Sequence, residues 1–398
     1  MAGRLGRSLA DLGSVGPCQP VGLPALSLPV DTAAAVDAML AHVDEYDGFH
    51  SAAAVVPAAV VVPAAFAVAR HEGLAGGRFL DAVLAGYEVV VETGLRFTGP
   101  QLYGSSWWPT ALFGAIGAAA ATSVLLDLDE ESLTTALCIA AAGTGGLLSD
   151  AELSEGHHLL VGNAVGRGVA AAYQSRAGMS AARTLLDGPA SRALGRRPLP
   201  PQPAERVHLA GCSVKPYPCA RPLHAVIDAL HQLADSGVDL ESLTAVRIGL
   251  PGPLLAFVSD DKEVAGPSEA AASAAFAVAA AIAGRESDVT FYRNAVLTPT
   301  QKALTVTIAP DAELDLLYPE QWGATVTLFR AAAPDARSVT VLGGQQEDQE
   351  ALVLEKFRRN ARDLKPAVMS AWQDRLLHVD DVTDMSVFHA DELESVVR

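Results

Sequence analysis

The chain has 398 residues and a net charge of −18, and 50% of its residues are hydrophobic, 19% charged and 6% aromatic. This hydrophobic content excludes a disordered chain, and the lack of any Lys/Arg run longer than a pair argues against nucleic acid and anionic membranes as partners. The first residues lack the apolar segment of a signal peptide, so we expect a cytoplasmic protein.

The first half of the chain is predicted to be helical. Two uncharged stretches, residues 51–69 and 107–126, are long enough to resemble membrane spans. Both are rich in Ala rather than Leu, and Pro57 and Pro63 interrupt the first, so we interpret them as buried core helices. Further helical patterns cover residues 76–97, 129–146 and 162–179.

Composition changes at the Pro-rich residues 196–205, which we interpret as a linker. Strands rich in β-branched residues are predicted beyond it, together with two helices. The predicted strands are residues 244–250, 303–310, 324–331 and 336–344, and the predicted helices are residues 221–237 and 268–284. Two amphipathic helices, residues 351–364 and 366–379, follow and are expected to pack on the first half of the chain.

This order of elements predicts a mostly α-helical protein with a smaller α/β (α+β) domain. We expect residues 1–205 to form the helical domain and residues 206–348 to form the α/β domain. Residues 349–398 are expected to supply the C-terminal helices that return to the helical domain. Ser268 is a plausible N-cap for the helix of residues 268–284.

A first cluster of candidate catalytic residues lies in residues 42–50. Three carboxylates and two histidines occur within these nine residues, and such groups can accept and donate protons. Glu45, Asp47 and His50 are the candidates in this cluster. The alternative interpretation is a solvated, capped loop between two helices.

Two tryptophans occur in residues 105–110, where a helix is predicted to begin. The free N–H groups of a helix N-terminus can bind anions, which makes Trp108 a candidate for a binding site. Tryptophan is also highly buried on average, so the alternative is an aromatic anchor of the core.

The adjacent residues His157 and His158 form a third candidate. Histidine titrates near neutral pH and can move protons. Neighbouring residues on a helix point to different sides, so these two cannot easily share a metal ion, and the sequence places no third ligand beside them. The alternative is a pair of surface histidines.

A fourth candidate is the loop of residues 214–224, which carries Lys215, Tyr217 and Arg221 ahead of a predicted helix. Two cations near a helix N-terminus can hold a carboxylate. Pro216 and Pro218 stiffen the loop. Because a stiff loop is of little use to a solvated lysine, we favour a functional role for Lys215.

The same loop, VKPYPCARPLHAVIDA, resembles the signature KxYPxCRxxHxxIDA of the MmgE/PrpD family. That family includes 2-methylcitrate dehydratase, cis-aconitate decarboxylase and iminodisuccinate epimerase. Residues 60–89, 107–131 and 268–284 resemble three further segments of the family in the same order. The resemblance runs from the region of Leu40 to the C-terminus.

The resemblance implies a mostly helical domain built from both chain ends, with an inserted α/β lid. It also implies a homodimer that acts on a small molecule and uses no metal or organic cofactor. The implied chemistry is abstraction or delivery of a proton beside a carboxylate, with loss of water or CO2, or epimerisation. Among the polar pocket positions of the family, Lys215 clearly matches its counterpart.

Other positions depart from the family pattern. Here Phe49 replaces Thr, Trp108 replaces His, His157 replaces Lys and Phe276 replaces Tyr. These replacements remove charges and hydrogen-bond donors, and buried carboxylates need paired charge. The departures therefore indicate a larger and less anionic substrate than the usual tricarboxylates, as in specialised (natural-product) metabolism.

Three functions agree with these observations. The first is a cofactor-independent lyase or isomerase, in which Asp47, His50 or His157 moves a proton and Lys215 holds an oxyanion. The second is a cyclase or rearrangement enzyme whose pocket shapes the substrate, and the third is a catalytically silent member that binds a ligand or partner. The residues expected to contact the substrate are Glu45, Phe49, Trp108, His158, Tyr217, Arg221 and Phe276.

Overall fold

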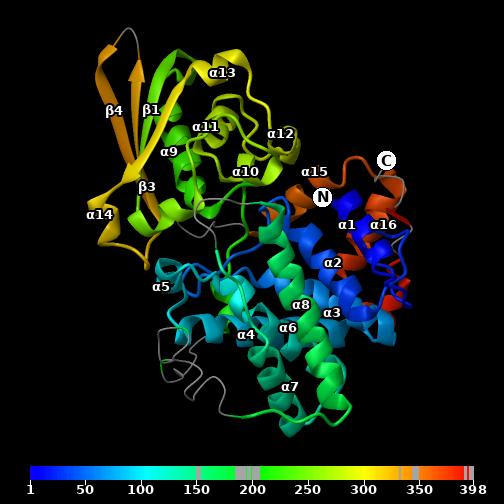
Figure 1. Cartoon of the computed structure of the whole chain (residues 1–398). Coiled ribbons are helices and arrows are strands. Elements are labelled where there is room, and N and C mark those ends of the chain that lie inside the picture. Colours follow the sequence, from blue (N-terminus) through cyan, green and yellow to red (C-terminus); the bar gives the residue numbers. More distant parts are fainter. Residues whose placement is uncertain are drawn as a thin grey trace.

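The computed structural model describes residues 1–148, 154–183, 194, 199, 207–330, 333–342, 349–389 and 392–393. A helical part holds the first eight α-helices, and a sheet part, residues 217–342, holds a four-stranded sheet (Figure 1). The predicted fold class, mostly α-helical with a smaller α/β part, is confirmed. The helices of the helical part are α1 (Ala2–Asp11), α2 (Val30–His42), α3 (Pro57–Glu72), α4 (Gly76–Arg96), α5 (Gly99–Leu102), α6 (Pro109–Leu125), α7 (Glu130–Ala142) and α8 (Glu155–Arg176).

The two uncharged stretches contain buried helices. α6 is buried along almost its whole length and packs against α3, α4 and α8. α3 begins at Pro57 but continues through Pro63, so the predicted interruption at Pro63 is wrong. Packing on a mostly buried helix supplies more stability than one lost backbone hydrogen bond removes. No helix in the described ranges is both long enough and apolar enough to cross a membrane.

Small residues allow these helices to approach each other closely. A Cβ atom added to Gly168 of α8 would lie 2.6 Å from the Cβ of Ala118 on α6, and it would also meet the carbonyl oxygen of Ala115. An added Cβ on Gly117 would lie 2.8 Å from the Cβ of Val90 on α4. The Ala- and Gly-rich composition therefore permits tight helix packing.

The sheet has the strand order β2-β1-β3-β4. β1 pairs with β2 in parallel, and β3 pairs with β1 and β4 in antiparallel fashion. α9 and α11 pack against one face, where Val246, Ile248 and Val326 are buried. The bounds are β1 (Leu243–Leu250), β2 (Thr305–Pro310), β3 (Gly323–Arg330), β4 (Ala333–Leu342), α9 (His224–Asp235) and α11 (Ala274–Ile282). Four strands were predicted at these positions, and residues 343–344 lie outside the described residues.

The predicted helix of residues 268–284 is two helices. α10 (Pro267–Ala272) ends at Ser273, whose extended backbone separates it from α11. The hydroxyl of Ser273 donates to the carbonyl oxygen of Asp261 and caps the first turn of α11. Ser268 is not an N-cap, because it lies inside α10, where Gly266 is the N-cap. Shorter helices complete the sheet part: α12 (Val289–Asn294), α13 (Pro299–Ala303) and α14 (Ala312–Asp315).

The C-terminal helices α15 (Gln349–Asn360) and α16 (Pro366–Leu377) pack near the N-terminal helices (Figure 1). Trp372 of α16 contacts Phe388, and Phe388 contacts Phe66 of α3. The predicted domain boundaries at residues 205 and 348 fall outside the described residues, as does nearly all of the Pro-rich linker. Those boundaries stay predictions.

Lys356 of α15 connects two loops. Its Nζ donates to the backbone carbonyl oxygens of Tyr46 and Lys215, at 2.7 and 2.8 Å, and it lies 3.9 Å from the centre of the Tyr46 ring. Burial lowers the pKa of Lys356 to about 8. The C-terminal helix thereby fixes the backbone beside the two loops that carry candidate site residues.

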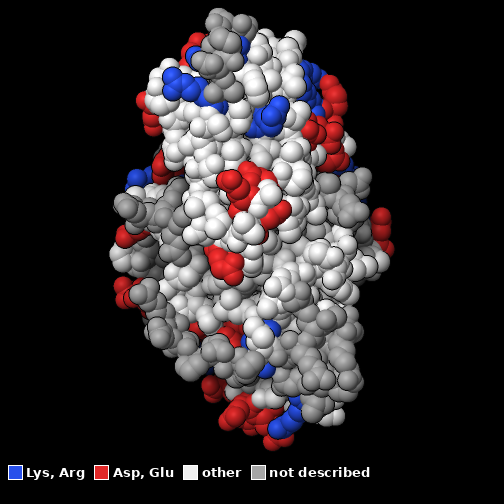
Figure 2. Space-filling view, turned by 90° about the vertical axis from the view of Figure 1, so that its left-hand side faces the viewer, with Lys and Arg blue, Asp and Glu red and all other residues white. Residues whose placement is uncertain are grey.

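Charge on the sheet-bearing side is mixed. Figure 2 shows Lys and Arg side chains scattered among uncharged and acidic ones, with acidic side chains gathered near the middle of this face. A nucleic-acid surface would need clustered basic residues. The described part of this face therefore agrees with the sequence-based argument against a nucleic-acid partner.

We predict that Gly168→Ala destabilises the protein by about 1–3 kcal/mol, because the added methyl group meets backbone atoms of α6 that cannot move away. The free energy of unfolding from urea denaturation measures this. Gly77→Ala is the matched control, since a Cβ there meets nothing within 4 Å. Equal stabilities of the two variants would contradict the packing argument.

We predict that Lys356 makes stability rise between about pH 8 and pH 10, where the unfolded chain still holds the proton that the folded chain has lost. The free energy of unfolding should increase by at most about 3 kcal/mol over this pH range. Urea denaturation at pH 7 and pH 9.5 should show it in the wild type. Lys356→Arg keeps donors but does not titrate in this range, so the same rise in that variant would refute the assignment.

Candidate active site

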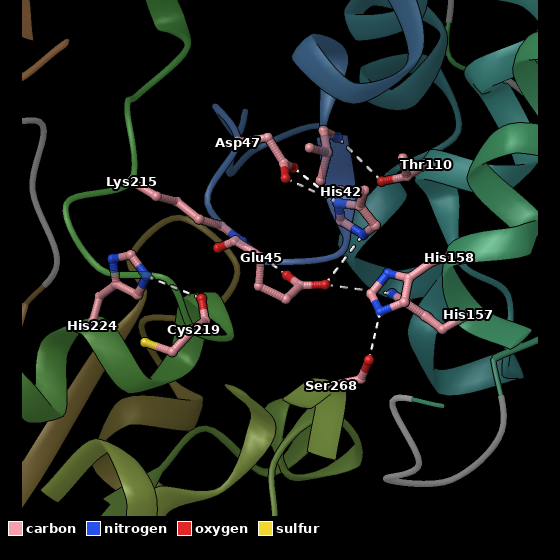
Figure 3. Close-up of polar contacts among 11 residues, drawn as sticks. His42, Glu45, Asp47, Thr110, His157, His158, Lys215, Cys219, His224 and Ser268 are labelled. Atoms are coloured by element: carbon pink, nitrogen blue, oxygen red, sulfur yellow. Dashed lines mark hydrogen bonds and ion pairs between the residues drawn. The ribbon is translucent and has the colours of Figure 1, made fainter. Parts of the chain in front are cut away.

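A cavity of about 50 Å³ lies where the helical part meets the sheet part. Polar groups from α2, α8 and the loop of residues 214–224 line one portion, and aromatic side chains line the rest. The lining residues are His42, Glu45, Phe49, Val56, Tyr103, Trp108, His157, Lys215, Ala220, Arg221, Pro222, Phe257 and Trp322. Figure 3 shows the polar contacts at this cavity.

His42 lies between two carboxylates. It is the last residue of α2, and the loop that follows carries both acids. The two oxygens of Asp47 lie 3.0 and 3.1 Å from its Nδ1, and Glu45 Oε1 lies 3.2 Å from its Nε2. Burial would lower the pKa of His42, but Asp47 and Glu45 outweigh burial and raise it. Glu45 has a left-handed backbone (φ 50°), which non-glycine residues rarely adopt and which is often found at functional sites.

Lys215 forms a buried ion pair with Glu45. Its Nζ lies 2.9 Å from Glu45 Oε2 and 3.0 Å from the backbone oxygen of Glu45, and the two side chains are 2% and 8% exposed. Burial would raise the pKa of Glu45, but Lys215, His42 and His157 hold it well below its usual value. Two carboxylates thus face two cations away from water, which a buried charge requires.

His157 and His158 point to different sides of the first turn of α8, as expected. His157 stacks on Trp108 with ring centres 3.8 Å apart, and its Nε2 lies 3.8 Å from Glu45 Oε1. Burial holds the pKa of His157 well below its usual value. The Nε2 atom of His158 lies 2.8 Å from the hydroxyl of Ser268, and burial lowers its pKa to about 4. Thus His157 faces the cavity and His158 joins α8 to α10.

Arg221 lines the cavity without a counter-ion. No hydrogen bond or ion pair joins it to any residue that the structure describes. Burial lowers the pKa of Arg221, and Asp228 offsets this only in part. Asp228 itself accepts a hydrogen bond of 2.8 Å from the hydroxyl of Tyr217. The guanidinium of Arg221 is therefore available to an anion in the cavity.

Aromatic side chains from both parts form the apolar wall. Phe49 contacts Trp322 edge-to-face at 5.3 Å between ring centres, and Tyr103 contacts Phe257 at 4.3 Å. The backbones of Phe49 and Ser213 exchange two hydrogen bonds of 2.9 Å, which holds the loop after α2 against the loop before Lys215. This wall suits an apolar portion of a ligand.

Five of the predicted site residues lie outside the cavity lining: Asp47, His50, His158, Tyr217 and Phe276. His50 accepts a hydrogen bond from the backbone N–H of Ala53 at 3.2 Å, and burial lowers its pKa to about 4. Phe276 is fully buried in the core of the sheet part, and Tyr217 packs in the same core. Phe276 and Tyr217 thus pack among residues of the sheet part and not in the cavity lining.

Seven lining residues were not among the predicted site residues: His42, Val56, Tyr103, Ala220, Pro222, Phe257 and Trp322. His42 had a signal, since it opens the acidic cluster of residues 42–50, but its pairing with Asp47 depends on where α2 ends. No sequence signal pointed to Tyr103, Phe257 or Trp322. Single aromatic residues far apart in the sequence are more readily interpreted as residues of the hydrophobic core. Asp47 and His158 do not line the cavity. Asp47 contacts His42, and His158 contacts Ser268.

One group at the cavity has the composition of a metal site. His42, Glu45 and His157 each offer a ligand atom, and these atoms lie within 4.8 Å of one another. The sequence missed this group because the loop after α2 and the first turn of α8 are far apart in the chain. Lys215 competes for the same carboxylate through its other oxygen.

Curated relatives resemble parts of the chain. A cis-aconitate decarboxylase of Aspergillus terreus is 27% identical over 236 residues, which cover 55% of this chain and 48% of that protein. A cis-aconitate decarboxylase-like protein of Aspergillus oryzae is 36% identical over 112 residues, or 26% of this chain and 23% of that protein. The chain thus matches about half or less of the length of these relatives.

Family comparison covers most of the chain. Residues 5–193 match the MmgE/PrpD N-terminal domain. Residues 217–378 match the MmgE/PrpD C-terminal domain. With the helical part, the sheet part and the cavity between them, these matches show that the chain belongs to the MmgE/PrpD family.

Proposed function

We propose that the protein is a lyase that binds an organic acid through one carboxylate and accommodates an apolar remainder. The observation that carries this proposal is Arg221, a partly buried residue of the cavity lining whose guanidinium has no counter-ion among the described residues. An unpaired buried charge is costly. A substrate carboxylate would offset that cost through two parallel hydrogen bonds.

Charge in the cavity limits how anionic the substrate is. His42 and Lys215 are already matched by Asp47 and Glu45, so Arg221 is the cation left over among the described lining residues. A tricarboxylate would bring three negative charges to this one guanidinium. An acid with a single anchored carboxylate and an apolar body fits better, since aromatic rings form the rest of the wall.

His157 is the group we propose to move the proton. In the reaction, His157 takes a proton from the carbon beside the bound carboxylate, and the electron pair forms a C=C bond as hydroxide leaves the next carbon. The protonated imidazole then gives that proton to the hydroxide, and water is released. Trp108 holds the imidazole in place by stacking, and Glu45 would stabilise its protonated form.

The relatives favour a second form of the same chemistry. Both are named as cis-aconitate decarboxylase or as similar to it. In decarboxylation a second carboxylate of the substrate leaves as CO2, and the electron pair left on carbon takes a proton that His157 passes on from water, which leaves hydroxide. From the family resemblance alone, we also propose a cytoplasmic homodimer.

We predict that Arg221→Gln weakens binding of 3-phenylpropionate, an apolar monocarboxylate, by about 10–100-fold, because a charge-assisted pair is lost. Isothermal titration calorimetry measures the change in Kd. The wild type should also bind 3-phenylpropionate at least about 10-fold more tightly than tricarballylate, a saturated tricarboxylate.

Arg247→Gln is the matched control, because Arg247 lies exposed on the sheet. It should leave both dissociation constants unchanged. Tighter binding of tricarballylate by the wild type would refute the single-carboxylate proposal. An unchanged Kd for 3-phenylpropionate in Arg221→Gln would remove Arg221 from the binding site.

We predict that 3-hydroxy-3-phenylpropionate is dehydrated and that His157→Gln lowers kcat by about 10²–10⁴-fold, the range for loss of a general acid–base group. In D2O the reverse reaction, addition of water to the C=C bond of the product, should place deuterium on the carbon beside the carboxylate. His208→Gln, in a His–Glu pair away from the cavity, is the control and should keep full activity.

Other outcomes distinguish the remaining functions. A rearranged product without deuterium would favour a cyclase whose pocket only shapes the substrate. Binding at Arg221 without turnover of hydroxy or unsaturated acids would identify a silent binding protein. An undiminished rate in His157→Gln would exclude His157 as the proton carrier.

A further inference from the structure

We propose that His42, Glu45 and His157 form a zinc-binding site, although the family resemblance implies a protein that uses no metal. His42 ends α2, Glu45 lies in the loop after it, and His157 lies in the first turn of α8 (Figure 3). Glu45 Oε1 lies 3.2 Å from His42 Nε2 and 3.8 Å from His157 Nε2. One ligand atom from each residue lies within 4.8 Å of the other two.

Two of these atoms lack hydrogen bonds although they are buried. Neither His42 Nε2 nor Glu45 Oε1 has a hydrogen-bond partner among the described residues, and the two side chains are 1% and 8% exposed. The contact of 3.2 Å between them is therefore not oriented as a hydrogen bond. Buried polar atoms without partners are rare and call for a ligand or an ion.

The distances are those of ligands on one ion. With zinc–ligand distances of about 2.1 Å, atoms 3.2 Å apart subtend an angle of about 100° at the ion, and atoms 3.8 Å apart about 130°. Both angles lie near the tetrahedral range. His42 and His157 would complete the set by a small approach of their rings.

The surroundings match those of metal-bound histidines and carboxylates. Asp47 holds His42 through Nδ1, which leaves Nε2 directed to the ion, and Lys215 holds the second oxygen of Glu45. Carboxylate partners of this kind orient metal-binding histidines and raise their affinity. Trp108 restrains the ring of His157 by stacking.

Two imidazoles and one carboxylate favour zinc. Catalytic zinc sites have three protein ligands and a fourth position open to water or substrate. The cavity of about 50 Å³ borders all three residues, so a fourth ligand has room. On binding, zinc would take the place of a proton on His42 Nε2, which leaves to solvent.

Zinc and the proposed proton transfer would exclude each other. The ion would occupy the lone pair of His157 that the proposed reaction uses to take a proton. This consequence rests on the proposed function, whereas zinc binding itself does not.

The test uses the full chain, stripped with EDTA and titrated with Zn²⁺ in competition with a chelator. We expect one equivalent to bind with a Kd below about 10 µM, and Glu45→Gln and His157→Gln to weaken it by at least about 100-fold. Asp47→Asn should weaken it by about 10–100-fold. His208→Gln, which alters a His–Glu pair near the surface, is the matched control and should leave the Kd unchanged.

A measurement on the wild type covers the case in which a variant fails to fold. Zinc-edge X-ray absorption of the one-equivalent complex should show nitrogen and oxygen ligands at about 2.0–2.1 Å, with the outer-shell pattern of two imidazoles. A sulfur shell would place the ion at cysteines and overturn the proposal. So would no binding below about 1 mM, or equal affinity in the wild type and both ligand variants.

The proposed competition between zinc and proton transfer at His157 is tested by a separate measurement. If zinc binds and the enzyme dehydrates its substrate, one equivalent of zinc should abolish deuterium incorporation, and EDTA should restore it. Zinc binding by a protein that shows no turnover even when it is metal-free would leave the metal site standing and refute the proposed function. Zinc binding with undiminished turnover would refute the shared use of His157.

Discussion

The buried carboxylate of Glu45 is the group on which the arrangement of the site depends. A buried carboxylate is stable only with paired charge and hydrogen bonds, and removing one partner of such a pair is strongly destabilising. Its partners come from three distant segments: His42 at the end of α2, His157 at the start of α8, and Lys215 in the loop ahead of α9. Each segment must fold correctly before the charge on Glu45 is compensated.

Close packing of small residues makes this meeting possible. α6 and α8 approach within the distance that only glycine allows at Gly168, and α8 delivers His157 against Trp108 at the start of α6. Lys356, from a helix near the other end of the chain, then fixes the backbones of Tyr46 and Lys215. The composition that at first suggests membrane spans therefore serves to bring chemically active ends of helices together.

One side of the cavity is lined by charged groups and the other by aromatic rings and Arg221. On the polar side, four charged groups are matched in pairs and hold one another in place. On the other side, aromatic rings line the cavity together with Arg221, which has no counter-ion among the described residues. Recognition by one cation in an apolar surrounding selects for few charges on the ligand, because each further carboxylate would be buried without a partner. Phe49 and Trp108, which replace a Thr and a His of the family pattern, also favour a substrate with few charges, because they offer a carboxylate no cation.

Much of this follows from local sequence. Hydrophobic periodicity and β-branched runs predict most helices and strands, and ordered motifs indicate the MmgE/PrpD family. The position of Lys215 directly before Pro216, in a loop that also holds Pro218, indicates a functional cation, and helix geometry separates His157 from His158. These features depend on residues near each other in the chain, so the sequence carries them directly.

Other features depend on contacts between distant residues. Ser273 divides a helix because it bonds to Asp261, and His50 turns away from the cavity because its ring accepts a backbone N–H from Ala53. Patterns along the chain are sufficient to predict the element types, the family and the polar residues that deserve study. The tertiary structure brings together His42, Glu45, His157 and Lys215 and leaves Arg221 without a counter-ion among the described residues, because helix packing, and not spacing along the chain, sets the distances between them.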